Sequence, residues 1–204
     1  MSLVSVLLKY HHRTSRLPQG QRVTASMARH LDRVGSLLDV GCGDGRNTRR
    51  LAETCGATTV AGVDVHVRDE TLIDVTPYDG RNLPFPDRSF DAVTLVDVLH
   101  HCEDPQRTLD EAVRVARTKV VLKDHLAFGG MTRRLLHLMD LVGNAKDGIP
   151  SPGTYFELRQ WVAMIDHAGA RMADMDWPLK THDLPWSLAG WPVLQFTAKL
   201  LPLR

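Results

Sequence analysis

The sequence predicts an α/β domain built on a doubly wound, mostly parallel β-sheet. Three observations lead to this fold class. Short apolar, β-branched runs alternate with amphipathic helical segments from about residue 36 onward. The first of these runs leads into a glycine-rich turn that opens a helix, as in a strand–helix unit of a parallel sheet. The chain has 204 residues, of which 43% are apolar and 24% charged, so it is long enough to bury one full core.

Seven short segments have the composition of buried strands. Continuous apolar runs suit strands that are covered on both faces, as parallel strands usually are. The expected strands are residues 36–40, 59–64, 72–76, 90–97, 119–123, 171–177 and 193–199. No helical segment separates the last two, so they are expected to pair as antiparallel neighbours at the edge of the sheet.

The helices between the strands have recognisable ends. Asp104 is a good N-cap, and Pro105 follows it at the first helical position. Thr154 and Glu157 have the spacing of a capping box. Gly143 is placed to end the third helix. The expected helices are residues 48–54, 105–116, 131–142 and 158–168.

Composition and charge argue against several classes of protein. The 25 basic and 24 acidic residues give a net charge of +1, so we expect no strongly basic nucleic-acid surface. Three cysteines cannot form a disulfide framework, so a reduced, cytoplasmic protein is expected. No apolar run reaches the roughly 18 residues of a membrane-spanning helix, so no stable membrane insertion is expected. The apolar opening Leu3–Leu8 lacks the flanks of a signal peptide and predicts an N-terminal helical segment within residues 1–35.

The most informative segment is the glycine-rich turn after the first strand. Gly41, Gly43 and Gly45 alternate there. Glycine is needed where the backbone approaches a ligand closely or adopts a positive φ. In an open α/β sheet this turn lies at the carboxyl edge, where ligands bind. A tight turn without a ligand is the simpler alternative, and three alternating glycines directly after an apolar strand make it the less favoured one.

The carboxylates near this turn favour a positively charged ligand that contains a nucleoside. The third glycine of the dinucleotide fingerprint G-x-G-x-x-G would fall at Arg46, so that fingerprint is broken. Asp39, inside the first strand, would repel a diphosphate but attract an ammonium or a sulfonium group. Asp64 ends the second strand, where a carboxylate accepts hydrogen bonds from ribose hydroxyls. Asp79 follows the third strand and can accept a hydrogen bond from an exocyclic amine such as that of adenine, although an ordinary loop would also suit it.

Together these motifs resemble those of class I S-adenosylmethionine-dependent methyltransferases, closest to the small-molecule group that includes quinone-biosynthesis enzymes. The resemblance covers residues 36–125. It is carried by Asp39-Val40-Gly41-Cys42-Gly43-Asp44-Gly45, Asp64, Asp79, Leu83-Pro84-Phe85-Pro86-Asp87, Phe90-Asp91 and Leu99-His100-His101. It implies the Rossmann-like methyltransferase fold, with seven strands of which the last is antiparallel. It also implies S-adenosylmethionine as cofactor and a small molecule as methyl acceptor.

The resemblance further implies which residues bind the cofactor. Backbone atoms of the glycine turn approach its methionine part, and acidic residues hold its ammonium, ribose and adenine groups. The implied contacts are Gly41, Cys42, Gly43 and Gly45 in the turn, Asp39 at the ammonium, Asp64 at the ribose, Val65 after it, Asp79 with Gly80 at the adenine, and Asp97 beside the cofactor. Two features depart from the family. Residues 65–71 leave little room for the usual helix, and residues 117–119 stand in place of the usual Pro-Gly-Gly turn.

Methyl transfer requires a base only if the acceptor must lose a proton. His100, His101, Asp124 and His125 follow the fourth and fifth strands at the same edge of the sheet. His125 and His101 are the preferred catalytic candidates, because imidazole titrates near neutral pH. A structural histidine in the wall of a pocket is the alternative. No second cluster has the spacing of metal ligands, so no metal site is expected.

Residues 124–155 are expected to form an insertion that acts as a lid over the substrate, with an amphipathic helix between glycine-containing ends. A helix packed permanently on the sheet is the alternative. Asn144, Tyr155 and the loop of residues 177–191 offer contacts to a partly apolar acceptor. Two other functions stay open on the sequence: a nicotinamide-dependent oxidoreductase, and a non-catalytic module that binds S-adenosylmethionine.

Overall fold

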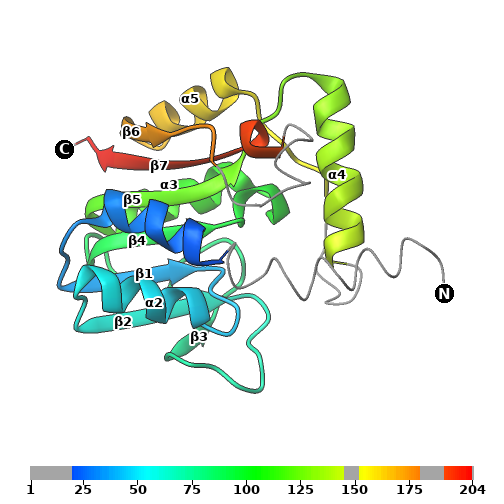
Figure 1. Cartoon of the computed structure of the whole chain (residues 1–204). Coiled ribbons are helices and arrows are strands. Elements are labelled where there is room, and N and C mark those ends of the chain that lie inside the picture. The colour runs from blue at the N-terminus through cyan, green and yellow to red at the C-terminus, as the bar shows by residue number, and fades with distance from the viewer. Residues whose placement is uncertain (1–19, 145–151, 180–190, 204) are drawn as a thin grey trace.

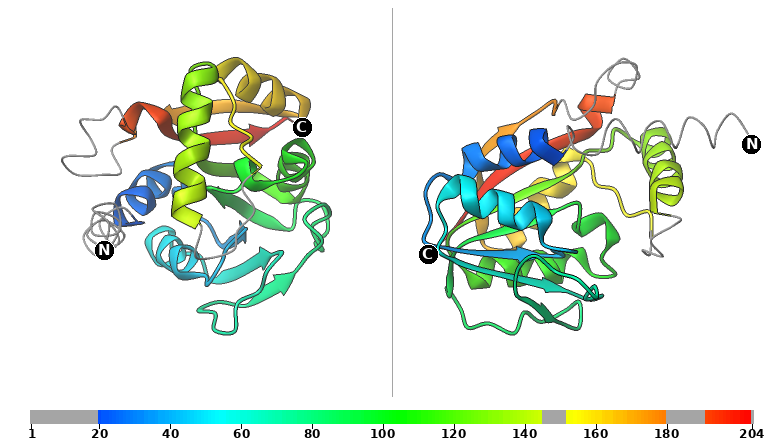
Figure 2. Two further views of the ribbon diagram at one scale, coloured as in Figure 1. Left: turned by 90° about the vertical axis from the view of Figure 1, so that its right-hand side faces the viewer. Right: turned by 60° about the horizontal axis from the view of Figure 1, so that its bottom comes forward.

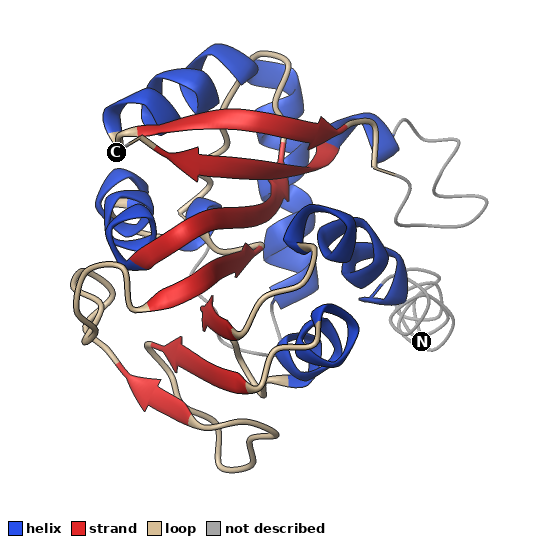
Figure 3. Cartoon of the chain, turned by 90° about the vertical axis from the view of Figure 1, so that its left-hand side faces the viewer, coloured by secondary structure: helices blue, strands red, loops and turns tan. Residues whose placement is uncertain are grey.

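Seven strands form one sheet with helices on both of its faces (Figure 1, Figure 3). The computed structural model describes residues 20–144, 152–179 and 191–203. A helix over residues 20–31 precedes the first strand. The elements then follow as β1 (Ser36–Val40), α2 (Arg46–Cys55), β2 (Thr59–Asp64), β3 (Val75–Pro77), β4 (Phe90–Val96), η1 (Leu99–His101), α3 (Pro105–Val115), β5 (Ala116–His125), α4 (Gly130–Asn144), α5 (Leu158–His167), β6 (Ala170–Asp176), η3 (Trp191–Leu194) and β7 (Gln195–Pro202).

The strand order is β3-β2-β1-β4-β5-β7-β6. Strands β1 to β5 are mutually parallel, and β7 is antiparallel to both of its neighbours. The predicted fold class is therefore confirmed, with β7 inserted between β5 and β6 so that β6 forms the edge. The order along the sheet reverses between β1 and β4. In sheets of this type the ligand crevice lies outside the carboxyl ends of the strands at that reversal.

Two apolar layers hold the helices to the sheet. Helix α5 and helix α3 cover one face, where Trp161 and Leu109 are fully buried. The helix over residues 20–31 and α2 cover the other face, where Met27 and Leu51 are buried. Burial of each such side chain contributes about 1.5–3 kcal/mol. The two layers fix the carboxyl edge on which the site is built.

Helix α4 belongs to neither layer and stands across the carboxyl edge of the sheet (Figure 1; Figure 2, left). This is the position in which a lid over the site is expected, and its movement remains a prediction. None of the described helices is long and apolar enough to cross a lipid bilayer.

Several element boundaries differ from those expected. Strand β3 begins at Val75 rather than at residue 72, because the N–H of Leu72 donates to the carbonyl of Asp44 and draws that segment to the glycine turn. Strand β5 begins at Ala116, directly after α3, so residues 117–119 form strand rather than the expected turn. The Thr118 hydroxyl donates to the Asp91 carbonyl at 2.6 Å and pins this start against β4.

The remaining differences lie in the C-terminal part. Gly143 lies within α4 instead of ending it. The capping box of α5 joins Glu157 to Gln160, whose side chain accepts the Glu157 N–H at 3.0 Å, so the predicted box with Thr154 was wrong. Strand β7 begins two residues later than expected, since residues 191–194 form the short helix η3. Residues 3–8, of the predicted N-terminal helix, lie outside the described residues.

A buried polar cluster attaches the helix over residues 20–31 to the C-terminal strands. Ser26 Oγ lies 2.6 Å from Thr197 Oγ1 and donates to Asp176 Oδ2 at 2.8 Å. The His30 side chain is buried, and its Nε2 lies 3.2 Å from Thr197 Oγ1. The cluster holds the helix at a fixed position beside α2, on the same face of the sheet as the glycine turn's helix.

Candidate active site

The turn after β1 uses glycine for its backbone conformation. Gly41, Gly43 and Gly45 have φ of 69°, 58° and 75°, in the region that L side chains rarely adopt. A Cβ on Gly41 would also lie 2.7 Å from a methyl group of Val98, and one on Gly45 2.5 Å from Ile73. At Gly43 an added Cβ would lie 3.7 Å from Nε of the Arg68 guanidinium, which is ordinary van der Waals contact. Close packing therefore requires glycine at Gly41 and Gly45, and at Gly43 the positive φ alone favours it.

The backbone N–H groups of the turn donate hydrogen bonds within the protein. The Gly43 N–H donates to Asp64 Oδ2 at 2.8 Å, which ties the turn to the end of β2. The donors with partners in the protein are those of Gly41, Cys42, Gly43, Gly45 and Arg46. A phosphate site at a helix N-terminus requires such N–H groups to point at the anion. This arrangement disfavours a diphosphate on the turn, and with it the nicotinamide alternative.

The charges below the turn favour a cation. Asp39 is buried, with its two carboxylate oxygens accepting from the hydroxyls of Thr48 and Thr94. Burial raises the pKa of Asp39 to about 6, with a further contribution from the charge of Asp64, while the two hydroxyls oppose the shift. Burial, followed by the charges of Asp39 and Asp64, also raises the pKa of the Cys42 thiol to about 12. A sulfonium or ammonium group would offset these unfavourable negative charges.

Asp64 is fixed at the end of β2. Its Oδ2 accepts from Gly43, and its Oδ1 accepts from the His66 N–H at 2.9 Å. Each carboxylate oxygen has a second lone pair, so Asp64 can still accept from ribose hydroxyls. Val65, half exposed, lies next to Gly80, where an added Cβ would be 3.3 Å from Val65 Cγ1. These residues border one side of the turn, and residues 65–74 contain no helix, as expected from their length.

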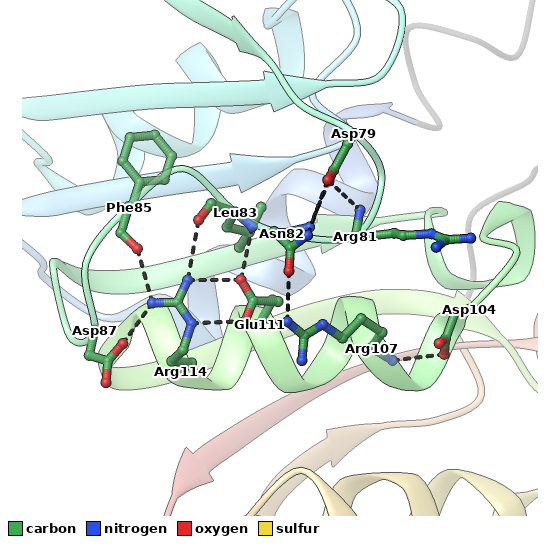
Figure 4. A network of polar contacts seen from close by, with 10 residues as sticks. All are labelled: Asp79, Arg81, Asn82, Leu83, Phe85, Asp87, Asp104, Arg107, Glu111 and Arg114. Atoms are coloured by element: carbon green, nitrogen blue, oxygen red, sulfur yellow. Dashed lines mark hydrogen bonds and ion pairs between the residues drawn. The ribbon is translucent and has the colours of Figure 1, made fainter.

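Asp79 shapes the loop after β3 (Figure 4). Its carboxylate accepts from the backbone N–H groups of Asn82 and Arg81 at 2.7 and 2.8 Å, and from Asn82 Nδ2 at 3.1 Å. These bonds, the one from the Asn82 N–H first, lower the pKa of Asp79. Asn82 Oδ1 in turn accepts from Arg107 of α3 at 2.7 Å. The contact of Asp79 with an adenine remains a prediction, and its role within the chain is to hold this loop.

An ion pair on α3, between the buried Glu111 and the partly exposed Arg114, anchors the same loop (Figure 4). Glu111 Oε2 accepts from the Leu83 N–H at 2.9 Å and pairs with Arg114 at 2.8 Å. Arg114 also donates to the carbonyls of Leu83 and Phe85, and to Asp87. Sequence analysis missed both residues, because a Glu and an Arg three positions apart on a helix usually mark a solvated face. Their contacts hold the loop that follows Asp79 against the sheet.

A second cluster of ionisable groups lies where β4 and β5 end. Asp97 follows β4 with a φ of 56°, and its Oδ1 binds the ammonium of Lys123, a side chain that is 2% exposed. His100 Nδ1 lies 2.7 Å from Asp124 Oδ1, with both side chains 2% exposed. The same Asp124 oxygen accepts the backbone N–H of His125 at 2.7 Å. The structure therefore brings together Asp97, His100, Asp124 and His125. It also adds Lys123, which was not predicted from the sequence.

The two histidines that flank Asp124 are shifted in opposite directions. Burial disfavours the charged form of His100, but the adjacent Asp124 carboxylate outweighs it and raises the pKa of His100. Burial, reinforced by the charge of Lys123, lowers the pKa of His125. Burial alone would raise the pKa of both carboxylates. The charge of His100 outweighs burial at Asp124, and the charge of Lys123 outweighs it at Asp97, so both pKa values are lowered. The cluster thus favours ionised carboxylates, a charged His100 and a neutral His125.

Aromatic rings surround His100 and connect the cluster to α4. The rings of His100 and His101 are 4.1 Å apart, and Tyr155 stacks on His100 at 5.4 Å. His101 Nε2 lies 3.6 Å from Asp140 Oδ1 of α4. The His101 and His125 side chains thus lie in one aromatic cluster. The Asn144 side chain and residues 180–190 of the predicted acceptor loop lie outside the described part of the structure.

Spacing alone would admit a metal ion in this cluster. The ligand atoms of Asp97, His100, Asp124 and His125 lie within 4.8 Å of one another. The ammonium of Lys123 already binds one carboxylate, and His100 binds the other. The two negative charges are therefore balanced by cations of the chain itself. The arrangement suits proton handling better than metal binding.

Comparison with known proteins agrees with this site. A family model described as "Methyltransferase domain" matches residues 38–122. The chain is 29% identical over 174 residues to a demethylmenaquinone methyltransferase of Renibacterium salmoninarum, covering 72% of this chain and 70% of that protein. It is 34% identical over 113 residues to methyltransferase GfsG of Streptomyces halstedii, covering 48% of this chain and 40% of that protein. A probable tRNA methyltransferase 9B of Bos taurus is 34% identical over 89 residues, which are 42% of this chain and 19% of that protein.

A solved structure shows the same fold. The S-adenosylmethionine-dependent methyltransferase of Aquifex aeolicus superposes with a TM-score of 0.62 at 18% identity, covering 93% of this chain and 94% of that one. Fold, family model and relatives therefore agree with the anionic glycine turn. Residues 38–122 therefore form a methyltransferase domain, and the chain has the fold of an S-adenosylmethionine-dependent methyltransferase.

Proposed function

We propose that this methyltransferase acts on a small, partly apolar acceptor whose attacking oxygen carries a proton, and that His125 removes that proton. The observation that carries the proposal is the state of the His125 ring. Its Nδ1 is shut off from solvent, whereas the side chain as a whole is 18% exposed. The exposed part of the side chain therefore lies away from Nδ1, and the proposal assigns the accepting nitrogen to Nε2. A neutral imidazole with an accessible nitrogen can accept a proton at neutral pH.

The chain's residues bind and orient the methyl donor at the first βα turn. When bound, S-adenosylmethionine supplies an electrophilic methyl group together with its leaving group. The backbone of the turn would approach the methionine part, Asp39 would provide negative charge beneath it, and Asp64 would accept from the ribose hydroxyls. Val65 and Gly80 border the position of the adenine. With the electrophile supplied, the protein's main task is to position the two reactants.

The acceptor loses its proton to His125 as it attacks. The O–H bond of the acceptor would break, its proton would bond to Nε2, and the freed electron pair of the oxygen would be available for the methyl group. The bound donor would supply that methyl group and would keep the electron pair of the carbon–sulfur bond on its sulfur. The resulting imidazolium faces the carboxylates of Asp97 and Asp124, whose Oδ1 atoms lie 3.6 and 3.7 Å from Nδ1. His101, paired with Asp140, is the second candidate for this role.

The surroundings of the site support a small, partly apolar acceptor. Phe128 and Trp177 are about half exposed and pack against each other with ring centroids 6.1 Å apart. Met131 and Leu135 expose apolar surface on α4. The net charge of +1 supports the proposal that nucleic acid is not the acceptor. Three free cysteines support a reducing, cytoplasmic compartment, and residues 124–155 are proposed as the lid.

The experiment uses a methyl-labelled donor and a cell extract divided into small-molecule and RNA fractions. We expect label in a product of the small-molecule fraction, identified by mass. Asp64→Asn should weaken donor binding, measured by calorimetry, by roughly tenfold or more, since a charge-assisted bond contributes about 1.5–3 kcal/mol. His125→Asn should bind the donor normally and label the product poorly. Label confined to RNA would refute the acceptor class. Donor binding without labelling of any fraction would favour a non-catalytic module.

A further inference from the structure

Asp124 contacts two histidines of the site, His100 and His125. Its Oδ1 lies 2.7 Å from His100 Nδ1, accepts the His125 backbone N–H at 2.7 Å and lies 3.7 Å from His125 Nδ1. We propose, on the basis of the proposed function, that Asp124 is a positioning residue for the base His125. Asp124 holds His100 as a cation. His125 is thereby left as a neutral proton acceptor, with its Nε2 toward the methyl-transfer site.

The balance of charge requires the two histidines to differ. The cluster contains two carboxylates, Asp97 and Asp124, and one ammonium, Lys123. One further cation balances these three groups, so a second permanent cation is disfavoured in the resting protein. His100 takes that place because it is hydrogen-bonded to Asp124, whereas His125 Nδ1 has no hydrogen-bond partner. His125 is therefore neutral until it receives a proton from the acceptor.

The geometry also selects the tautomer of neutral His125. Its Nδ1 faces the Oδ1 atoms of Asp97 and Asp124 at 3.6 and 3.7 Å. A lone pair on Nδ1 would be repelled by both carboxylates, whereas an N–H there is attracted to them. The proton therefore resides on Nδ1, and the lone pair resides on Nε2. Trp161 Nε1 donates to the His125 carbonyl at 3.1 Å and holds the residue in this place.

All elements packed against the two rings contribute charged or polar groups. Helix α4 and η1 present Asp140 and His101, which pair with each other 3.6 Å apart. Tyr155 stacks on His100 and meets His125 edge-on at 5.9 Å. The charged and titratable groups that face the rings are therefore Asp97, His101, Lys123, Asp124, Asp140 and Tyr155. Asp124 Oδ1 lies 2.7 Å from His100 Nδ1, which makes Asp124 the residue to test.

The test reads the ring states directly, without an acceptor. Protein labelled with ¹⁵N-histidine is examined by long-range ¹H–¹⁵N correlation spectra from pH 5.5 to 8.5, with His100→Gln and His125→Asn used for assignment. We expect His100 to be protonated on both nitrogens at pH 7.5, and His125 to be the neutral Nδ1–H tautomer. In Asp124→Asn, His100 should become neutral at that pH, and His125 should show both tautomers. Asp124→Glu should restore the charge on His100.

Asp140→Asn is the matched control, because it removes an equal charge from the same cluster, at a carboxylate that lies 3.6 Å from His101 Nε2. It should leave His100 charged at pH 7.5. If both variants discharge His100, or if wild-type His100 is neutral, the proposal is wrong.

A second variant and a kinetic measurement complete the test. Should Asp124→Asn fail to fold, the double variant His100→Gln/Asp124→Asn replaces the pair by neutral groups of similar size. Positioning predicts that kcat for the labelled product falls at least tenfold and that its pH profile changes, while KM and the donor Kd stay within about twofold. An unchanged kcat and pH profile would overturn the proposal. Expected ring states without methyl transfer would instead refute the proposed function.

Discussion

The buried carboxyl of Asp39 makes donor binding depend on pH in a predictable way. Its pKa is about 6, against an ordinary value of 3.8, chiefly because burial disfavours its charged form. The difference corresponds to about 3 kcal/mol of differential stabilisation of the protonated form. The folded state keeps this proton between pH 4 and 6 after the unfolded state has lost it. Ionisation of Asp39 therefore lowers the free energy of unfolding progressively as pH rises from 4 to 6. Above pH 6 this free energy stays lower by the full amount.

A cation bound beside Asp39 should reverse this cost. It favours the ionised carboxylate, so the free protein loses a proton on binding wherever Asp39 is still protonated. With a pKa of about 6, roughly a tenth of the carboxyl is ionised at pH 5 and nearly all at pH 8. The affinity for S-adenosylmethionine should accordingly increase by about tenfold from pH 5 to 8.

Calorimetric titration of wild-type protein and Asp39→Asn at four pH values tests this expectation. In Asp39→Asn the pH-dependent part should disappear, and affinity at pH 8 should fall by roughly tenfold. The variant should also be more stable at pH 8 by about 1–2 kcal/mol, since loss of one hydroxyl bond, about 1 kcal/mol, offsets part of the 3 kcal/mol gained. Asp79→Asn is the control, because that exposed carboxylate is ionised throughout this range. Equal pH dependence in wild-type protein and Asp39→Asn would refute the reasoning.

Further substitutions probe three regions: the turn, the charged cluster and the N-terminal helix. Gly45→Ala should lower the free energy of unfolding, measured in urea, by about 3 kcal/mol or more, because the left-handed backbone is strained and the added Cβ clashes with Ile73. Gly43→Ala should lower it by about 1–2 kcal/mol, from backbone strain alone. Equal losses in the two variants would contradict the packing argument. Asp97→Asn should lower the free energy of unfolding by about 3 kcal/mol, because the buried ammonium of Lys123 loses its partner. The double variant Asp97→Asn/Lys123→Met should recover most of the thermal stability. A double variant that is no more stable than Asp97→Asn would contradict this. Thr197→Val should lower the unfolding free energy by about 1–3 kcal/mol through loss of its buried hydroxyl contacts, with a wild-type value counting against the cluster.

Local signals were sufficient for the elements whose ends are set by their own residues. Strands β1 and β2 begin and end at the predicted residues, because an apolar run passes directly into a glycine turn or an acidic residue. Asp104 caps α3 as expected, and its side chain accepts from Arg107 N. Strand β3 was misplaced since a tertiary hydrogen bond to the Asp44 carbonyl, which no local pattern announces, removes Leu72 from the sheet.

The same division applies to the site. The spacing of Asp39 and Asp64 around the glycine turn predicted an anionic turn, and the charges near Cys42 are consistent with it. The contact of His100 with Asp124 joins residues 24 positions apart on different elements, so sequence spacing gave no indication of it. Lys123 lies inside an apolar run and carries a detectable signal, because a lysine at a buried strand position requires a buried partner.

Strand order makes the anionic turn and the histidine cluster parts of one site. Because β1 lies beside β4, the end of β4 passes directly beneath the turn, where an added Cβ on Gly41 would be 2.7 Å from Val98. Val98 follows Asp97, and its carbonyl accepts the N–H of His101. The side chain of Val98 thus lies between the glycine turn, where Asp39 provides negative charge, and the segment that carries the candidate bases. An acceptor held by the histidines would therefore meet the methyl group at the place where β1 and β4 diverge. This accounts for the two neighbouring parts of the site: an acidic turn for the cationic donor and a charge-balanced cluster for the acceptor.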